Sequence, residues 1–123
     1  MKTYDWAKIK TDHITGLYSR KVAVGDNVAV ARLEAKKGAA TRMHSHQNEE
    51  IILVLNGKWR FFLPNGDVTL EANQMLRIPP GVEHGSEVLE DVVAIDVCSP
   101  ARMDWISGED RSLHYDEQYL WAV

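Results

Sequence analysis

Three histidines and one glutamate lie in two short segments with the spacing of a metal site. His44, His46 and Glu50 occur in the first segment, and His84 follows a Pro-Pro-Gly turn in the second. Alternate side chains of a strand share a face, so His44, His46 and Glu50 point to one side, whereas Glu49 points to the other. We therefore expect His44, His46, Glu50 and His84 to bind one metal ion per chain.

Three imidazoles and one carboxylate form a donor set that suits several divalent transition metals, namely Fe, Mn, Ni, Co, Cu or Zn. The sequence does not select among them. In a six-coordinate site, four protein ligands leave two positions for water or substrate, which is typical of a catalytic centre. The alternative is a domain that has lost its metal and keeps the histidines as hydrogen-bonding groups.

Two further charged residues are expected beside the metal ligands. Arg42 shares the parity of His44, so its guanidinium is expected in the same cavity, where it could bind a carboxylate; a salt bridge at the rim is the alternative. Asp96 interrupts the apolar run Asp91–Cys98. Its small-residue face is expected to form a pocket wall, with Asp96 as general acid or base, or as a hydrogen-bonded structural residue. Cys98 on that face is expected to be a small pocket residue rather than a nucleophile.

The elements that carry these residues are predicted to be β-strands, because short β-rich runs alternate with turn residues and helical periodicity is nearly absent. Gly25–Asn27 is expected to join the hairpin strands Val22–Val24 and Val28–Leu33. Asn56-Gly57 is typical of a tight turn between Ile51–Leu55 and Lys58–Leu63. The remaining expected strands are Asp67–Glu71, Met75–Ile78 and Val92–Cys98. Such spacing predicts an all-β sandwich or barrel, in which Trp59 and Phe61 belong to the core rather than to a sugar-stacking platform.

The same residues resemble the two motifs of the cupin superfamily. The first motif, Gly-x5-His-x-His-x3-Glu-x6-Gly, is matched at every position, by Gly38, His44, His46, Glu50 and Gly57. The second is matched at Pro79, Gly81 and His84, with Asn73 in place of its first glycine and Val88 in place of its last asparagine. The resemblance implies a double-stranded β-helix, or jelly-roll barrel. It places motif 1 at 38–57 and motif 2 at 73–88 of one cupin domain, 1–123.

The segment from Ile95 to Arg102 also resembles single-domain cupins that process unsaturated uronates from pectin and alginate breakdown. Those proteins carry an Ile/Val-Asp-Val-Phe-Ser-Pro-Pro-Arg stretch, whose Asp and Arg correspond to Asp96 and Arg102 and have catalytic roles in that family. Two positions depart from the pattern: Cys98 replaces the aromatic residue, and Glu50 replaces the usual Gln of the first motif.

Composition narrows the classes of partner. The chain has 123 residues, a net charge of −4 and one cysteine, which favours one globular domain in a reducing, cytoplasmic setting without disulfides. No basic cluster suggests nucleic acid, and no apolar run is long enough to cross a membrane. A small-molecule substrate is the expected partner. Four aromatic residues in the segment 100–123 suggest packing on the barrel or on a second subunit of a homodimer, namely Trp105, Tyr115, Tyr119 and Trp121.

These observations favour a metal-dependent enzyme with lyase or isomerase chemistry on a small carboxylate-bearing, sugar-derived substrate. Asp96 would move a proton, and Arg42 or Arg102 would bind the carboxylate. Two alternatives stay open: an Fe(II)-dependent dioxygenase, and a ligand-binding cupin without catalytic activity.

Overall fold

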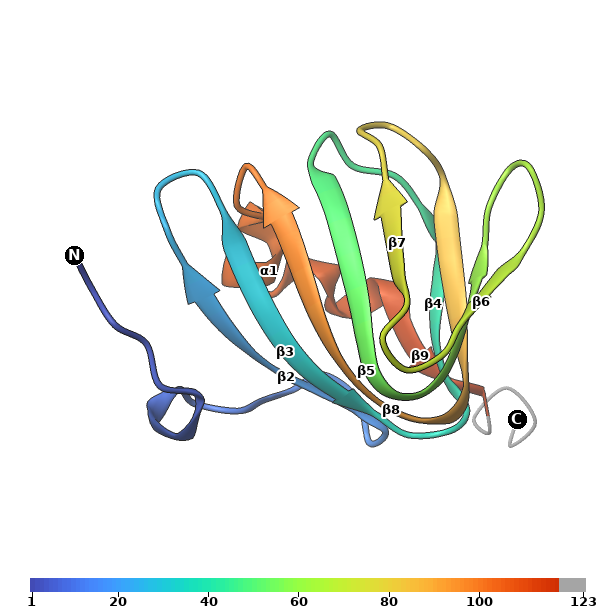
Figure 1. Ribbon diagram of the computed structural model, residues 1–123, viewed down its shortest axis with the longest axis horizontal. Coiled ribbons are helices and arrows are strands. Elements are labelled where there is room, and N and C mark those ends of the chain that lie inside the picture. The colour runs from blue at the N-terminus through green and yellow to red at the C-terminus, as the bar shows by residue number, and fades with distance from the viewer. Residues whose placement is uncertain (118–123) are drawn as a thin grey trace.

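Two long strands determine the shape of the fold, which is seen in a computed structural model describing residues 1–117. β5 (Glu49–Phe62) and β8 (His84–Ser99) are antiparallel neighbours along most of their lengths. Figure 1 shows both strands bending sharply near the bottom of the view, so that each contributes to both walls of a barrel. The second half of β8 pairs with β3 (Ala29–Ala35), and its first half pairs with β4 (Ala39–His44). The all-β jelly-roll prediction is confirmed.

The other strands extend these two walls. β2 (Tyr18–Val24) pairs with β3, whereas β6 (Val68–Leu70) and β7 (Met75–Ile78) pair with opposite halves of β5. The short strands β1 (Asp12–His13) and β9 (His114–Asp116) lie at the ends of the sheet order. The helical elements are η1 (Trp6–Lys8), α1 (Met103–Ser107) and η2 (Glu109–Leu113). Among residues 1–117, none of these is long and apolar enough to cross a membrane.

The core lies between the walls because each strand buries alternate side chains. In β8, Val92, Ala94, Asp96 and Cys98 face inward, and the residues between them are partly exposed on the outer surface. Trp59 and Phe61 are both buried, as expected, with ring centroids 4.7 Å apart. The buried members of the main cluster are Tyr18, Leu33, Ala35, Ala39, Ile52, Val54, Trp59, Phe61, Leu70, Ile78, Val88, Val92 and Ala94.

The prediction of a tight turn at Asn56-Gly57 is wrong. β5 continues through both residues, and its register with β8 shifts there, as at a β-bulge. Gly57 has φ 93°, and a Cβ at this position would lie 2.0 Å from the carbonyl oxygen of Asp91. Gly57 provides the positive φ that both a tight turn and a β-bulge can use. Because β5 pairs with β8 on both sides of this position, the chain forms a bulge here and not a turn.

One departure from the second cupin motif keeps the backbone conformation of the motif. Asn73 is the only non-glycine residue with positive φ in residues 1–117, at 69°. Asparagine tolerates this left-handed region better than most residues, so it can stand where the family has glycine.

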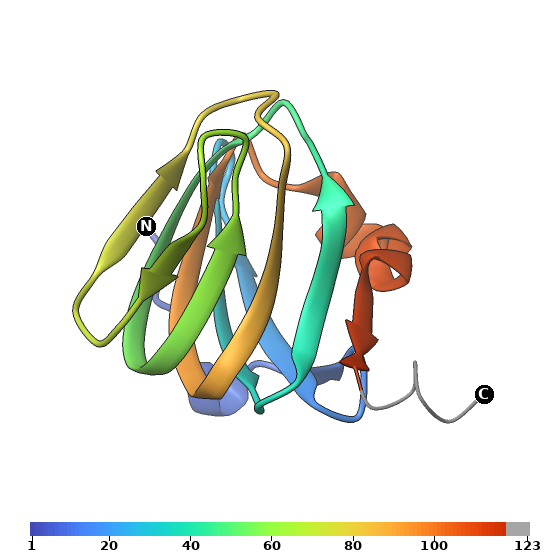
Figure 2. The same ribbon diagram turned by 90° about the vertical axis from the view of Figure 1, so that its right-hand side faces the viewer.

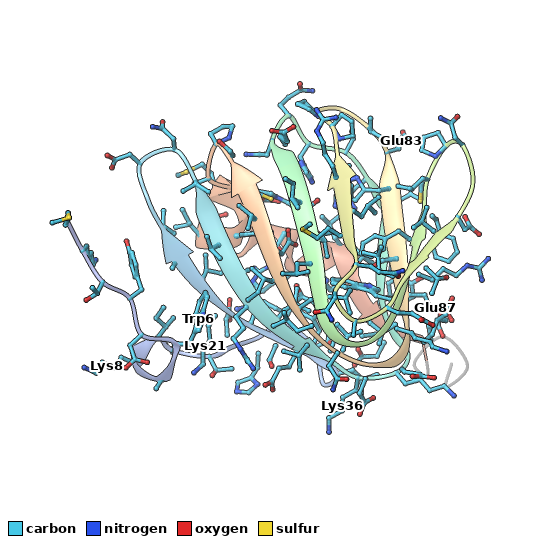
Figure 3. All side chains as sticks on the ribbon, viewed as in Figure 1. Trp6, Lys8, Lys21, Lys36, Glu83 and Glu87 are labelled. Carbon is cyan, nitrogen blue, oxygen red and sulfur yellow. The ribbon has the colours of Figure 1, made fainter. Side chains whose placement is uncertain are left out.

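The helical turn η1 and the segment from α1 to β9 lie on different sides of the barrel (Figure 2). Near the N-terminus, Lys21 Nζ donates to the carbonyl of Trp6 at 2.7 Å, two residues labelled in Figure 3. In the C-terminal segment, Trp105 is buried and Tyr115 lies in β9, beside β4. The segment 100–117 therefore packs on the barrel; Tyr119 and Trp121 lie outside the described residues.

Candidate metal centre

The elements that carry the four expected metal ligands meet at one end of the barrel, where β4 ends and β5 and β8 begin, toward the top of Figure 1. His44 ends β4, His46 lies in the following loop, Glu50 is near the start of β5, and His84 begins β8. Glu50 Oε1 is 3.2 Å from His46 Nε2 and 3.3 Å from His84 Nε2. One ring nitrogen from each histidine lies within 4.8 Å of the others. Two sequence motifs that are far apart in the chain thus meet at one point.

Local hydrogen bonds fix the orientation of each histidine. In all three, Nδ1 faces a backbone carbonyl two residues away: His44 faces Arg42 at 2.7 Å, His46 faces Asn48 at 3.0 Å, and His84 faces Val82 at 2.8 Å. A carbonyl accepts, so we assign the proton of each neutral ring to Nδ1. Each Nε2 then presents a lone pair to the centre of the cluster, which is the arrangement of metal-binding histidines.

The charges in the cluster also fit a cation. Burial lowers the pKa of His44 to about 4, so this ring is neutral near pH 7. Glu50 is only 4% exposed, and its carboxylate faces two of the Nε2 lone pairs. Acceptors facing acceptors in a buried space are unfavourable unless a proton or a metal lies between them. The donor set therefore fits one divalent metal ion held by His44, His46, Glu50 and His84.

Behind Glu50 lies a second buried carboxyl group, that of Asp96. Carboxylate oxygens of the two residues lie within 4.8 Å of each other and of Cys98 Sγ. Burial, together with the Glu50 carboxylate, raises the pKa of Asp96 well above its usual range. Its surroundings thus favour the proton-bearing form of Asp96, next to the expected metal ligands. Burial also raises the pKa of the Cys98 thiol, so Cys98 is not a thiolate. Cys98 does not line the cavity, contrary to the expectation, because its side chain is fully buried in a cluster with Ala29, Ala31 and Trp105.

Arg102 borders the same cavity from the C-terminal segment. Its side chain is 5% exposed, and its Nε donates to Asp104 Oδ1 at 2.8 Å, with Nη2 donating to Oδ2. The guanidinium also lies over the ring of Trp105, 5.3 Å from its centroid. Asp104 occupies one edge of the guanidinium, which leaves Nη1 for a ligand. The cavity itself measures ≈ 40 Å³, and ≈ 440 Å³ when the open space at its mouth is included. The residues that line it are Tyr18, Thr41, His44, Glu50, Ile52, Trp59, Phe61, His84, Gly85, Ser86, Asp96, Arg102, Trp105, Leu113 and His114.

The structure differs from the expectation that Arg42 faces this cavity. The pairing of β4 with β8 shifts register between Thr41 and His44, and this irregularity breaks the strict alternation that placed Arg42 with His44. Thr41 lines the cavity, whereas Arg42 is exposed, with its guanidinium 4.7 Å from the ring centroid of Tyr115. His46 also lies beyond the end of β4, so a loop and not strand parity brings it to the cluster.

Glu49, the alternative carboxylate, points away from the cluster. Its Oε2 accepts from Arg77 Nε at 2.6 Å, and both side chains are largely exposed. This is the direction that alternation predicts for a residue next to the inward-facing Glu50.

Sequence reasoning missed four polar residues of the cavity wall, Tyr18, Thr41, Ser86 and His114. Each borders the cavity together with the expected residues. Tyr18 lies in a strand without a motif, whereas Thr41 and Ser86 lie within the two cupin motifs, at positions that the motifs do not specify. His114 belongs to the C-terminal segment, where only the density of aromatic residues indicated packing. Inward strand parity could have identified Ser86, since His84 and Ser86 share a face.

Comparison with known proteins agrees with this geometry. The family described as Cupin domain matches residues 31–98, which is more than half of the chain. No curated protein matches. Among solved structures, an RmlC-like cupin from Shewanella frigidimarina is 23% identical, with a TM-score of 0.77 over 83% of this chain and 93% of that one. KdgF from Halomonas sp. is 22% identical, with a TM-score of 0.78 over 85% and 99%.

A third solved structure, ectoine synthase from P. lautus, has a TM-score of 0.76 and 12% identity over 94% of this chain and 89% of its own. At these identities the solved structures share the fold alone. The matched family, the two motifs and the barrel lead to one conclusion: this chain belongs to the cupin family.

Proposed function

We propose that this protein is a metal-dependent enzyme that isomerises or cleaves a small carboxylate-bearing, sugar-derived substrate such as an unsaturated uronate. One observation carries the proposal: the buried carboxyl group of Asp96 lies within 4.8 Å of Glu50 in a cavity that Arg102 also borders, and its raised pKa favours the proton-bearing form. The resemblance of Ile95–Arg102 to the uronate-processing cupins supports the choice of substrate.

Different residues of the cavity would bind the substrate, transfer the proton and hold the metal. Arg102 binds the substrate carboxylate through Nη1, because Asp104 holds the other edge of the guanidinium. Asp96 carries a proton in a buried site and can deliver it to a substrate carbon or oxygen, then take one back. A metal held by His44, His46, Glu50 and His84 would act as a Lewis acid toward a substrate oxygen.

The reaction class matches these groups. Opening the ring of an unsaturated uronate to its keto form conserves every atom; one proton leaves an oxygen and another reaches a carbon. Such an isomerisation needs a proton carrier and an anion-binding group, and no external oxidant or reductant. Asp96 and Arg102 supply both functions.

Metal binding is tested first. We expect about one transition metal per chain in protein purified without added metal, and loss of that metal when His44, His46, Glu50 and His84 are all replaced by alanine. Glu49→Gln is the matched control, because its carboxylate faces Arg77 and not the cluster. Stoichiometric metal in the quadruple variant, measured by element analysis, would refute the assignment.

Catalysis is tested by following the ultraviolet absorbance of a 4,5-unsaturated uronate, in parallel with an oxygen electrode. Asp96→Asn removes the ionisable group and should lower kcat by about 100-fold or more, with metal content unchanged. Arg102→Lys should raise KM for the acidic substrate, whereas Arg42→Lys should have little effect because Arg42 lies outside the cavity wall. Stoichiometric oxygen consumption without uronate turnover would favour the dioxygenase, and tight binding without turnover would favour a ligand-binding protein.

A further inference from the structure

A second set of polar residues lies next to the cavity, outside both cupin motifs. Two of its members, Tyr18 and His114, line the cavity wall, and Arg20 and Asp110 lie behind them. Arg20 of β2 donates twice to Asp110 of η2, from Nη1 to Oδ2 at 2.5 Å and from Nη2 to Oδ1 at 2.7 Å. His114 Nε2 lies 3.2 Å from the same Oδ2. The ring of Tyr18 stacks on the ring of His114, with centroids 4.5 Å apart and planes inclined by 25°. His114 is therefore held both along its edge and across its face.

These contacts determine which nitrogen of His114 carries the proton. Hydrogen bonds from Arg20 and His114 outweigh the effect of burial and hold the pKa of Asp110 below its usual range, so Asp110 is a carboxylate. A carboxylate only accepts, so Nε2 of His114 is the nitrogen that donates. In the neutral ring, Nδ1 is then an acceptor.

That acceptor has no partner. Within residues 1–117, four buried side-chain atoms make no hydrogen bond, and two of them belong to residues that line the cavity: His114 Nδ1 and Trp59 Nε1. The side chain of His114 is 10% exposed, and Trp59 as a whole is 5% exposed. Each unpaired buried group costs about 1–3 kcal/mol, so both are expected to find a partner when a ligand fills the cavity.

We propose that His114 and Trp59 form a hydroxyl-binding subsite in this cavity, in which His114 Nδ1 accepts from one ligand hydroxyl and Trp59 Nε1 donates to a ligand oxygen. One acceptor and one donor together select a polyhydroxylated ligand over an aliphatic acid of the same size. The subsite adds to the proposed function a binding site for the hydroxyl groups of a sugar-derived ligand whose carboxylate binds Arg102. It rests on the proposed function only for the identity of the ligand.

The test uses the zinc-loaded, diamagnetic protein with ¹⁵N-labelled histidine, and D-galacturonate and erythritol as probes. NMR reports the protonation of each ring nitrogen directly, and His114→Gln identifies the His114 signals. We expect the proton of the neutral ring on Nε2, and a shift of the Nδ1 resonance on addition of either probe. Erythritol carries hydroxyls without a carboxylate, so its effect does not depend on Arg102.

Two variants separate the roles of the His114 nitrogens. Glutamine places its amide near the position of Nε2 and asparagine places it near the position of Nδ1. His114→Gln should therefore keep the contact with Asp110 and weaken D-galacturonate binding by about 10-fold, and His114→Asn should weaken it less. Trp59→Phe, which removes the N–H and keeps an aromatic ring, should also weaken binding.

Each outcome decides the matter. A proton on Nδ1 of the neutral ring would overturn the subsite. The subsite would also be overturned if D-galacturonate bound without shifting the Nδ1 resonance and His114→Gln bound D-galacturonate as tightly as the wild type. That result is expected if only ordered water occupies the site. A shift with erythritol but no binding of D-galacturonate would support the subsite and reject the uronate substrate. No response to either probe would overturn the subsite.

Discussion

Replacing Asp110 with asparagine should destabilise the fold strongly, because it leaves a guanidinium buried without its counter-charge. The side chains of Arg20 and Asp110 are 1% and 0% exposed, and two hydrogen bonds join them. Asparagine keeps the shape of the side chain and one acceptor oxygen. The substitution therefore removes the negative charge while creating little cavity, which makes the change in stability an electrostatic measurement.

The expected loss follows from the burial of the pair. Breaking a buried ion pair from one side typically costs about 3–5 kcal/mol, whereas an exposed pair contributes about 0–1 kcal/mol. For a chain of this length, that loss lowers Tm by about 10–20 °C. The surface pair of Arg60 and Asp67 is the matched control, since its side chains are 42% and 39% exposed at a separation of 2.6 Å. Asp67→Asn should cost less than about 1 kcal/mol.

Urea unfolding of the wild type and both variants, followed by circular dichroism between pH 3 and pH 7, provides the assay. The pKa of Asp110 is lowered by folding, so its stabilising contribution is complete above its unfolded pKa of about 3.9 and is lost as the pH falls toward the folded value. The difference between wild type and Asp110→Asn should therefore be constant near neutral pH and shrink below about pH 4. A loss below about 1 kcal/mol at pH 7, or a difference that grows in acid, would refute the reasoning.

Two further predictions concern the backbone and the outer surface. Gly57→Ala should lower the free energy of unfolding in urea by at least about 2 kcal/mol, because the new Cβ would meet the Asp91 carbonyl and the backbone has φ 93°. Gly66→Ala is the control and should cost less, because a Cβ there would have no atom within 4 Å. Equal losses in the two variants would contradict the role of the close approach to Asp91. The sequence predicts a homodimer through the C-terminal segment, but residues 100–117 pack on the barrel, so we propose instead a homodimer through the outer face of β5 and β7, where Ile51 and Met75 are 40% and 65% exposed. Light scattering at micromolar concentration should give twice the mass of 13.9 kDa, and Ile51→Glu with Met75→Lys should give the monomer; a monomeric wild type would contradict it.

The clustering of the four expected metal ligands was predictable because their geometry depends on short-range features. Each histidine faces a carbonyl two residues away in the chain, so a local motif already determines ring orientation. The buried position of Asp96 was likewise predictable, since strand alternation holds through the second half of β8. Where alternation holds, a sequence pattern places side chains on the correct face.

The errors arose where alternation is interrupted. The register shift in β4 turns Arg42 out of the cavity wall, and the bulge at Gly57 makes one bent strand out of two predicted ones. Both irregularities depend on pairing with β8, a partner far away in the sequence. Asn56-Gly57 favours a tight turn and a β-bulge about equally, because both need a residue with positive φ. Pairing with the distant strand β8 therefore determines which of the two forms.

The cavity therefore has two halves with different origins. Short-range hydrogen bonds orient the metal ligands, whereas His114 takes its position from Asp110 and, through it, from Arg20, which lies 90 residues from Asp110 in the sequence. Arg102 is held by Asp104 and Trp105 of the same C-terminal segment. Substitutions in that segment can alter the groups that meet a ligand while the bonds that orient the histidines stay intact. Ligand selectivity is thus expected to vary through residues 102–114 at little cost to metal binding.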